Sequence, residues 1–590
     1  MDFTECYGDT VSTVAAAARS GCWRTVRRLI RRGCSMDRRD NRGWTALHEA
    51  AAGGSAECVR EIMRAVWKKG SPSDCREYVS ILTHEGESAC FLAAQRGHLS
   101  VLRLLLKGNP PEFDINQLTN DLSCPLYAAV DNGHKDVVEL LVRKGAELNR
   151  THTHSCWTCL HQAVYKGHSG IVRLLSTVCD LEAVDEHNIT PLFLAAQHGQ
   201  RECLEILINA ESSGTSVCEF FGVSCASGAD VNAAAADLAN PLFIASQGGH
   251  ESCVELLLDH DADPDEPCSN EWNQLPIHAS AEFGHIGILR RLIAVTSRII
   301  DRMKILRSPL YSAVQSRQTE CVKILLEEGY HPNAQYYPGE PGGGLGSPLT
   351  WALCLEPYQP DSESVKLLLA AGGNLCEGDM FYALCTDKMD LLELILQHKW
   401  IPRLQVLLGF VPPYKGKTAF TQWELSELLW VALNQLETAP WWLPLLLKAG
   451  LDPHLLLRRE YLVLNAESEV LNYLLEFVNW STIDRDLKCI LDERQSEKTW
   501  EPPPFFGSVP SLFHLCRLEL REILGTDRLI RDEVIQQLPV PAVLHKFLQF
   551  RDIPDLSLPH SPLRFCPPCR DCLSFFYLKR KILDIPYVAL

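Results

Sequence analysis

Three histidines stand where a catalytic or metal-binding group would first be sought. His48, His161 and His278 each end the same kind of short phrase, WTALH, WTCLH and LPIH. The HEAAA stretch that starts at His48 lacks the second histidine of a zinc-protease helix. A histidine at a repeated position more often ties a turn to the following helix by hydrogen bonds. We therefore expect a structural role for all three, no catalytic residues, and a chain that is not an enzyme.

Cysteine offers a second kind of chemistry near the C-terminus. Cys566, Cys569 and Cys572 in CPPCRDC could supply three thiolate ligands to zinc, but a closed site needs four and no second pair follows. We expect residues 551–590 to form a disordered tail rather than a metal site. The glycine-rich stretch around Pro341 lacks the GK[ST] ending of a phosphate-binding loop, so we predict no nucleotide and no cofactor.

The overall composition disfavours several classes of partner. The chain has 56 basic and 74 acidic residues, a net charge of −18, whereas a nucleic-acid partner needs a positive face. The basic run RTVRRLIRRG is interpreted as a solvated outer cap, with an acidic partner or a targeting role as the alternative. No apolar run reaches membrane-spanning length, and the start lacks a signal-peptide pattern. Because the cysteines stand singly along helical segments, we expect a reduced, cytoplasmic protein without a membrane span.

The elements that must position any site come from an internal repeat. One phrase, such as ITPLFLAAQHGQ at Ile189, returns about every 33 residues, the period of ankyrin repeats. Thr190 is placed to cap the first helix of its repeat, Pro191 fills the first helical position, and Gly199 ends the helix. A second amphipathic helix and a turn follow, and no unit can bury its apolar face alone. This pattern resembles the ankyrin family, which implies a solenoid of helix pairs with projecting β-hairpins.

The predicted domain order follows from where this pattern weakens. Residues 9–376 hold about ten repeats, with a surface-loop insertion at 211–227 and a Gly/Pro-rich linker near 336–347. Residues 377–500 hold degenerate ankyrin-like and capping helices, because the helix pairs persist there without their usual start. Residues 505–550 form a separate C-terminal element ahead of the tail.

Tryptophans lie just before several of the repeated phrases. Trp44, Trp157 and Trp272 fall at or beside the expected hairpin tips, where a repeat array presents its recognition surface. Arg42 and His187 would share that face. Such aromatic residues either anchor a protein target or pack on neighbouring hairpins, and the sequence leaves both alternatives open.

The segment from Val509 to Phe550 contains a short amphipathic helix that Ser511 can cap. Apolar residues recur on one face of it at three- and four-residue steps: Leu512, Leu515, Cys516, Leu520 and Ile523. A helix this short is stable only when its apolar stripe is buried. The stripe is covered either by this chain, as a further capping pair of the array, or by a partner.

The same segment resembles a SOCS box. The pattern Ser511-Leu512-x-x-x-Cys516-x-x-x-Leu520 matches its BC box, at 510–524. The run Leu538-Pro539-Val540-Pro541 looks like its cullin box, at 536–548, with Phe547 where the family often has tyrosine. An ankyrin array followed by such a segment resembles the ankyrin repeat and SOCS box proteins. The implied fold is an all-α ankyrin-repeat solenoid followed by a small three-helix SOCS box.

This resemblance implies a non-catalytic substrate-recognition subunit of an E3 ubiquitin ligase. Elongin B and Elongin C would be bound by Ser511, Leu512, Leu515, Cys516 and Leu520. Cullin-5 with its RING subunit would be bound by Leu538, Pro539, Val540 and Pro541. The ankyrin array would hold an unidentified protein target. The alternative is an ankyrin interaction scaffold that recruits no ligase.

Overall fold

The computed structural model describes most of the chain. The described residues are 13–69, 72–107, 113–152, 155–210, 228–268, 274–297, 308–334, 347–354, 362–375, 379–380, 383–384, 389–401, 418–457, 460–506, 508–524, 535–538, 540–554 and 556. Several predicted features lie outside these residues: the insertion at 211–227, nearly all of the linker near 336–347, Trp272, Pro539, and the tail from 557 onward with Cys566, Cys569 and Cys572.

The chain divides into two compact units, residues 1–297 and 298–590. The first unit is built from consecutive helix pairs, with the extra helix α5 (Pro72–Val79) after the second of them. The pairs are α1 (Thr13–Arg19) with α2 (Trp23–Arg31), α3 (Ala46–Ala52) with α4 (Ala56–Lys69), α6 (Ala89–Gln95) with α7 (Leu99–Leu105), α8 (Pro125–Asp131) with α9 (Lys135–Arg143), α10 (Cys159–Tyr165) with α11 (Ser169–Leu175), α12 (Pro191–Gln197) with α13 (Arg201–Ile208), α15 (Pro241–Gly248) with α16 (Glu251–Asp259), and α17 (Pro276–Phe283) with α18 (Ile286–Val295).

Helix ends in this unit follow the predicted chemistry. Thr190 Oγ1 accepts a hydrogen bond from Phe193 N at 3.2 Å, and Pro191 takes the first helical position of α12. Glycine is required where the first helix ends. At Gly97, φ is +76°, and an added Cβ would lie 2.6 Å from the His134 ring, which hydrogen-bonds Gln95 O at 3.1 Å. The glycine therefore lets the histidine of the next repeat reach back and join the two.

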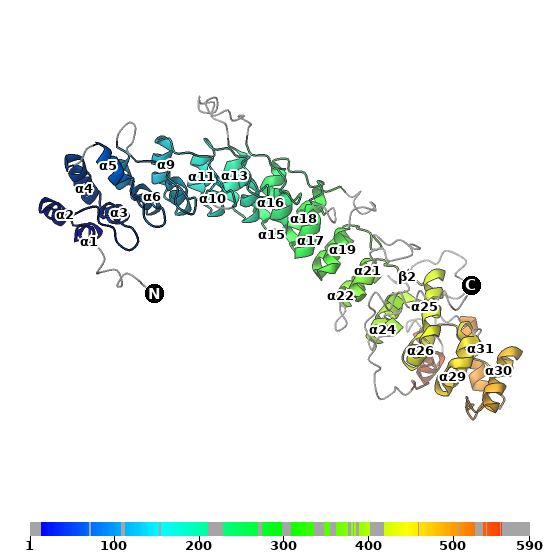
Figure 1. Ribbon diagram of the computed structural model, residues 1–590. Helices are drawn as coiled ribbons and strands as arrows, with labels where there is room; N and C mark the ends of the chain where they lie inside the picture. Colours follow the sequence, from blue (N-terminus) through cyan, green and yellow to red (C-terminus); the bar gives the residue numbers. More distant parts are fainter. Residues whose placement is uncertain are drawn as a thin grey trace. The chain divides into compact units, whose positions relative to one another are not determined.

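The first helices pack on one another in chain order, and so do the second helices. Figure 1 shows the two resulting layers, with α9, α11 and α13 along one and α10 and α15 along the other. Ala195 and Ala196 are fully buried, as expected for small residues that let neighbouring helices approach closely. The predicted all-α repeat solenoid is therefore confirmed for this unit.

The projecting hairpins are tight turns. They are closed by backbone hydrogen bonds, as from Asp40 N to Trp44 O at 3.0 Å, and neighbouring turns are joined, as from His84 N to Arg42 O at 2.9 Å. Within the described repeats, extended pairing is limited to an isolated bridge between His152 and Trp157. These turns are thus shorter than regular β-hairpins, because each needs only to reverse the chain and contact the turn of the neighbouring repeat.

The second unit begins with two more helix pairs and then becomes irregular. Its helices are α19 (Pro309–Gln315), α20 (Thr319–Glu327), α21 (Pro348–Cys354), α22 (Ser362–Ala370), α24 (Met389–His398), α25 (Gln422–Asn434), α26 (Ala439–Lys448), α27 (Pro453–Leu457), α28 (Glu460–Asn465), α29 (Ser468–Leu475), α30 (Arg485–Ser496), α31 (Leu512–Leu524) and α34 (Ala542–Leu548), with 3₁₀ turns η3 (Leu436–Thr438) and η4 (Trp480–Thr482). A two-residue strand β1 (Lys399–Trp400) pairs in parallel with β2 (Thr418–Ala419).

A buried ion pair holds this irregular region together. Lys399 Nζ lies 2.6 Å from Glu424 Oε1, and both side chains are almost fully buried. Glu424 also accepts the backbone N–H groups of Thr421 and Leu375, so its charge has several partners. In the part of the chain that the structure describes, no helix is both long and apolar enough to cross a membrane.

Candidate functional site

Helix α31 begins as the sequence predicts. Ser511 Oγ accepts a hydrogen bond from His514 N at 3.2 Å, and Ser511 O accepts from Leu515 N at 3.0 Å. The serine therefore satisfies a donor of the first turn and fixes where the helix starts. That start determines which side chains share a face.

The predicted apolar stripe of α31 is largely uncovered. Leu512 is 77% exposed, and Cys516 and Leu520 are also exposed, whereas Leu515 is half-buried. The side chain of Ile523 lies outside the described residues. A helix that capped the array would turn its apolar stripe inward. Exposure of Leu512 speaks against that alternative and leaves the face open to a partner.

The opposite face of α31 is anchored by a buried histidine. His514 Nε2 donates a hydrogen bond to Val478 O at 3.0 Å, and its ring lies 4.6 Å from that of Trp480. Trp480 Nε1 in turn donates to Ser508 O at 3.0 Å. Burial lowers the pKa of His514, because a charged imidazole loses hydration there. The neutral ring therefore fits this position.

Arg517, one turn further along the same face, joins α31 to α34. Its guanidinium lies 4.4 Å from the ring centres of both Phe547 and Phe550, and its Nη1 is 3.1 Å from the carboxylate of Asp552. Burial lowers the pKa of Arg517, and the Asp552 charge opposes that shift. Sequence analysis did not single out His514 or Arg517. The sequence signal that could have identified them is their spacing of three residues, which places both on the face of α31 away from the apolar stripe.

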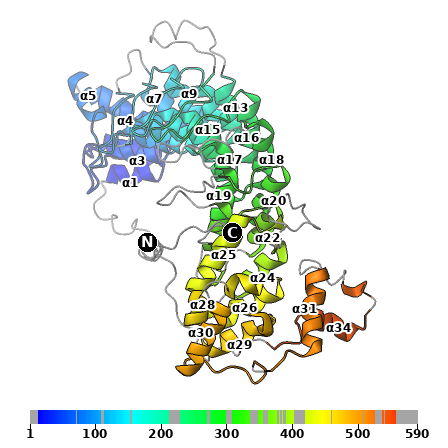
Figure 2. The same ribbon diagram turned by 90° about the vertical axis from the view of Figure 1, so that its right-hand side faces the viewer.

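The predicted cullin box lies on the other side of this contact. Ile535, Phe547 and Leu548 form a small core, against which Leu538 and Leu544 pack. The Phe513 ring packs at a tilt against that of Phe547, with ring centres 3.8 Å apart, and Figure 2 shows α31 and α34 side by side. Two helices of the expected three-helix SOCS box are thus among the described residues.

The four residues of the predicted cullin-binding run differ in their surroundings. Leu538 is half-buried in the small core, so part of its surface is used within the chain. Val540 is half-buried, and Pro541 is exposed at the start of α34. Pro539 lies outside the described residues. Val540 and Pro541 therefore test partner binding more cleanly than Leu538 does.

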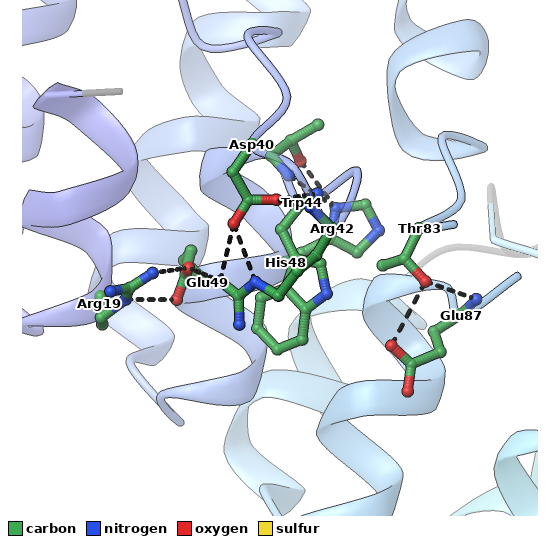
Figure 3. A network of polar contacts seen from close by, with 9 residues as sticks. Arg19, Asp40, Arg42, Trp44, His48, Glu49, Thr83 and Glu87 are labelled. Carbon is green, nitrogen blue, oxygen red and sulfur yellow. Dashed lines mark hydrogen bonds and ion pairs between the residues drawn. The ribbon is translucent and has the colours of Figure 1, made fainter. Parts of the chain in front are cut away.

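Trp44, one of the predicted target-binding residues, packs inside the array. It is only 9% exposed and contacts Ala52 and Leu92. Arg42 lies over the Trp44 ring, 4.1 Å from its centre, and pairs with Asp40 and Glu49 at 2.8 and 2.7 Å. Figure 3 shows these residues together. Arg19 also pairs with Glu49, at 2.5 Å. These contacts favour the local-packing alternative for Trp44 and show how Arg42 is held.

Trp157 has a mixed environment. It is half-buried, its Nε1 donates to Asp185 Oδ2 at 3.2 Å, and its ring lies 5.3 Å from that of Tyr165. The neighbouring His187 is exposed. Trp157 and His187 thus keep accessible surface, while Trp272 lies outside the described residues.

A concave pocket adds residues that the sequence did not suggest. Its volume is about 460 Å³, and its lining is mainly apolar. It is lined by His187, Ile189, Phe193, Gln197, Ala235, Ala236, Asp237, Ala239, Phe243, Ile244, Gln247, Cys268 and Gln274. Phe193 lies in α12 and Phe243 in α15, which are the first helices of their repeats, and both lie next to the turns. Of these residues, only His187 was predicted.

The repeated histidines make the hydrogen bonds expected of them. His161 Nδ1 accepts from Thr158 at 2.8 Å, and its Nε2 donates to Ile189 O in the next turn at 3.0 Å. Burial lowers the pKa of His161, and it lowers that of His48 to about 4. Both rings are therefore neutral structural links between a turn and a helix.

Comparison with known proteins covers both parts of the chain. Residues 508–549 match the SOCS box family, and the ankyrin repeat family matches at 14–70, 62–152, 151–219, 210–299 and 242–336. The chain is 38% identical to "Ankyrin repeat and SOCS box protein 3" of Bos taurus, over 94% of this chain and 96% of that protein. It is 38% identical to the protein of the same name from Homo sapiens, over 94% of this chain and 97% of that protein.

Proposed function

Since the chain belongs to the family of ankyrin repeat and SOCS box proteins, we propose that it is the substrate-recognition subunit of an Elongin B/C–cullin-5–RING ubiquitin ligase. Family membership supports the general role of substrate adapter. The specific partners are our proposal, and the exposed apolar face of α31 is the observation that carries it. The adapter itself breaks no bond, and we place it in the cytoplasm.

Elongin B and Elongin C are proposed to cover the face of α31 made by Ser511, Leu512, Leu515, Cys516 and Leu520. Leu512 dominates this contact, because it is 77% exposed and has the most apolar area left to lose. Burying a leucine side chain is worth about 1.5–3 kcal/mol. Discounted for the part already covered, removal of Leu512 should weaken binding roughly seven- to fiftyfold.

Cullin-5 is proposed to contact the run from Leu538 to Pro541. The core of Ile535, Phe547 and Leu548 packs against Leu538 and so holds that run in place. Arg517 ties this core to α31, so one small unit would present both partner surfaces at a constant spacing. A constant spacing matters because the ligase must hold its target within reach of the transferred ubiquitin.

The ankyrin array is proposed to bind the protein target, with Trp44, Trp157, Trp272, Arg42 and His187 as the candidate contacts. Among those described, His187 is exposed and borders the apolar pocket, while Trp157 is half-buried. An aromatic or aliphatic side chain of the target would fit a pocket of that lining.

Co-purification of the full chain from cells tests the ligase assignment. Leu512→Ala with Cys516→Ala should lose Elongin B and C and, with them, cullin-5. Val540→Ala with Pro541→Ala should keep Elongin and weaken cullin-5. Leu464→Ala is the matched control, because Leu464 is a 50% exposed leucine of α28 in the same unit.

Two outcomes decide between the candidate functions. Elongin retained by the Leu512/Cys516 variant would contradict the assignment of the α31 face. Absence of cullin-5 from the unaltered chain, with Elongin also absent, would favour an ankyrin interaction scaffold that recruits no ligase.

A further inference from the structure

Two cysteines and a histidine from successive repeats meet in the interior of the first unit. Cys124 caps α8, Cys159 is the first residue of α10, and His152 lies in the turn that leads into α10. All three are fully buried, and their ligand atoms lie within 4.8 Å of one another. Within the described residues, this is the one group of three such side chains gathered this closely.

None of the three residue types recurs at its position in the other repeats compared. The capping position occupied by Cys124 varies among them and holds Thr45, Ser88, Thr158, Thr190, Asn240, Leu275 and Ser308. The position occupied by Cys159 holds proline in five repeats, at Pro125, Pro191, Pro241, Pro276 and Pro309, and alanine in two, at Ala46 and Ala89. The backbone hydrogen bond that closes each turn identifies the position equivalent to His152, which holds Asp40, Thr83, Thr119, Asp185, Ala235 and Cys268 in other repeats. These positions vary from repeat to repeat, but among the repeats compared only this boundary combines two cysteines and a histidine at one point.

The replacement of the turn residue changes its partners. Asp185 Oδ1 accepts the N–H groups of His187 and Ile189 and so closes its own turn. His152 instead donates from Nδ1 to Leu122 O of the preceding repeat at 3.0 Å. That bond places the ring hydrogen on Nδ1 and leaves the lone pair of Nε2 directed at Cys124. A carbonyl behind the ring in this way is how proteins orient metal-binding histidines.

The distance between the Cys124 and His152 ligand atoms suits tetrahedral zinc. Cys124 Sγ lies 3.5 Å from His152 Nε2. With Zn–S of about 2.3 Å and Zn–N of about 2.0–2.1 Å, tetrahedral angles place sulfur and nitrogen about 3.5 Å apart. Tyr127 N also donates to Cys124 Sγ at 3.3 Å, a contact that stabilises a thiolate.

We propose that Cys124, His152 and Cys159 bind a zinc ion that links two consecutive ankyrin repeats. Two thiolates and a neutral imidazole balance the charge of Zn²⁺, so the buried unit is neutral overall. Sulfur and imidazole ligands select zinc over calcium or magnesium, which prefer oxygen. With three protein ligands this is not a closed four-ligand site, and a solvent molecule would take the fourth position. Binding replaces the two thiol protons, which leave to solvent.

The repeat pattern itself supplies variants that should fold. Cys124→Thr, His152→Thr and Cys159→Pro each install the residue that other repeats of this chain carry at that position. Cys203→Ser is the matched control, because Cys203 is an equally buried cysteine of α13 outside the cluster. All proteins carry serine in place of Cys566, Cys569 and Cys572, so that the tail adds no zinc.

The measurement is the zinc content of the full chain, purified with a non-chelating reductant, by elemental mass spectrometry. The unaltered cluster and the Cys203 control should hold about one zinc per chain, and each cluster variant should lose it. Cobalt supplied to the metal-free chain with an intact cluster should give the absorption of a tetrahedral thiolate site, a readout that needs no variant.

Three results would overturn the proposal: zinc content unchanged in the cluster variants, no tetrahedral cobalt spectrum, or a Cys124–Cys159 disulfide in the freshly isolated protein. Chelation should lower the melting temperature of the protein with an intact cluster and leave that of the cluster variants unchanged. Equal effects on both would likewise argue against a zinc link.

Discussion

Replacement of Arg517 by alanine should loosen α31 from α34 without touching the partner-binding face. The guanidinium is buried over two phenylalanine rings at 4.4 Å each, and a desolvated cation–π contact contributes about 1–2 kcal/mol. The ion pair adds only about 0.5–1 kcal/mol, because Asp552 is 43% exposed. The local stability of this contact should therefore fall by about 1.5–3 kcal/mol.

Hydrogen exchange measures this change better than global unfolding does, because a long repeat chain does not unfold in one step. A loss of about 1.5–3 kcal/mol predicts about 13- to 160-fold faster exchange in α31 and α34. Exchange in α10, in the other unit, should stay the same. Arg485→Ala is the matched control, since Arg485 is an exposed arginine of α30. Unchanged exchange in α31 of the Arg517 variant would refute the anchoring role.

Three further predictions concern the ankyrin array. The pKa of His48 is lowered from 6.5 to about 4, so on acidification the histidine takes up a proton in the unfolded state before it does in the folded state. Stability should therefore fall as the pH drops from 6.5 toward about 4. Hydrogen exchange in α3, measured from about pH 7 to about pH 4.5, should show this loss of stability, and His48→Gln should remove it. Gly97→Ala should destabilise more than Gly33→Ala, judged by thermal melting, because both have positive φ but only Gly97 has a side chain against it. Trp44→Ala should cost about 3–5 kcal/mol of local stability by exchange, whereas Trp157→Ala should mainly reduce target capture in proximity labelling; the reverse order would be inconsistent with their burial.

Sequence reasoning was most successful where one residue acts within its own turn. Ser511 and Thr190 cap their helices as predicted, since a cap needs only a side-chain oxygen three residues before a free N–H. The period of about 33 residues likewise predicts the solenoid, because each unit must bury its face on the next. The exposed stripe of α31 could be predicted for the same reason: helical spacing assigns residues to a face.

Whether a face is covered, and by what, was decided only by the tertiary structure. Trp44 and Trp157 look alike in the sequence, yet the first is buried by Arg42 and Leu92 while the second keeps accessible surface. Arg517 gains its importance from Phe547 and Phe550, which lie far along the chain.

The sequence by itself determined the repeat, its caps and the segment after it, because these depend on periodicity and on contacts within a few residues. The meeting of Cys124, His152 and Cys159 depended on how two repeats stack, with 28 residues separating the first two. Considered alone, each cysteine is interpreted as a small hydrophobic residue. Only the register of one repeat on the next brings their sulfurs and a ring nitrogen to the same point.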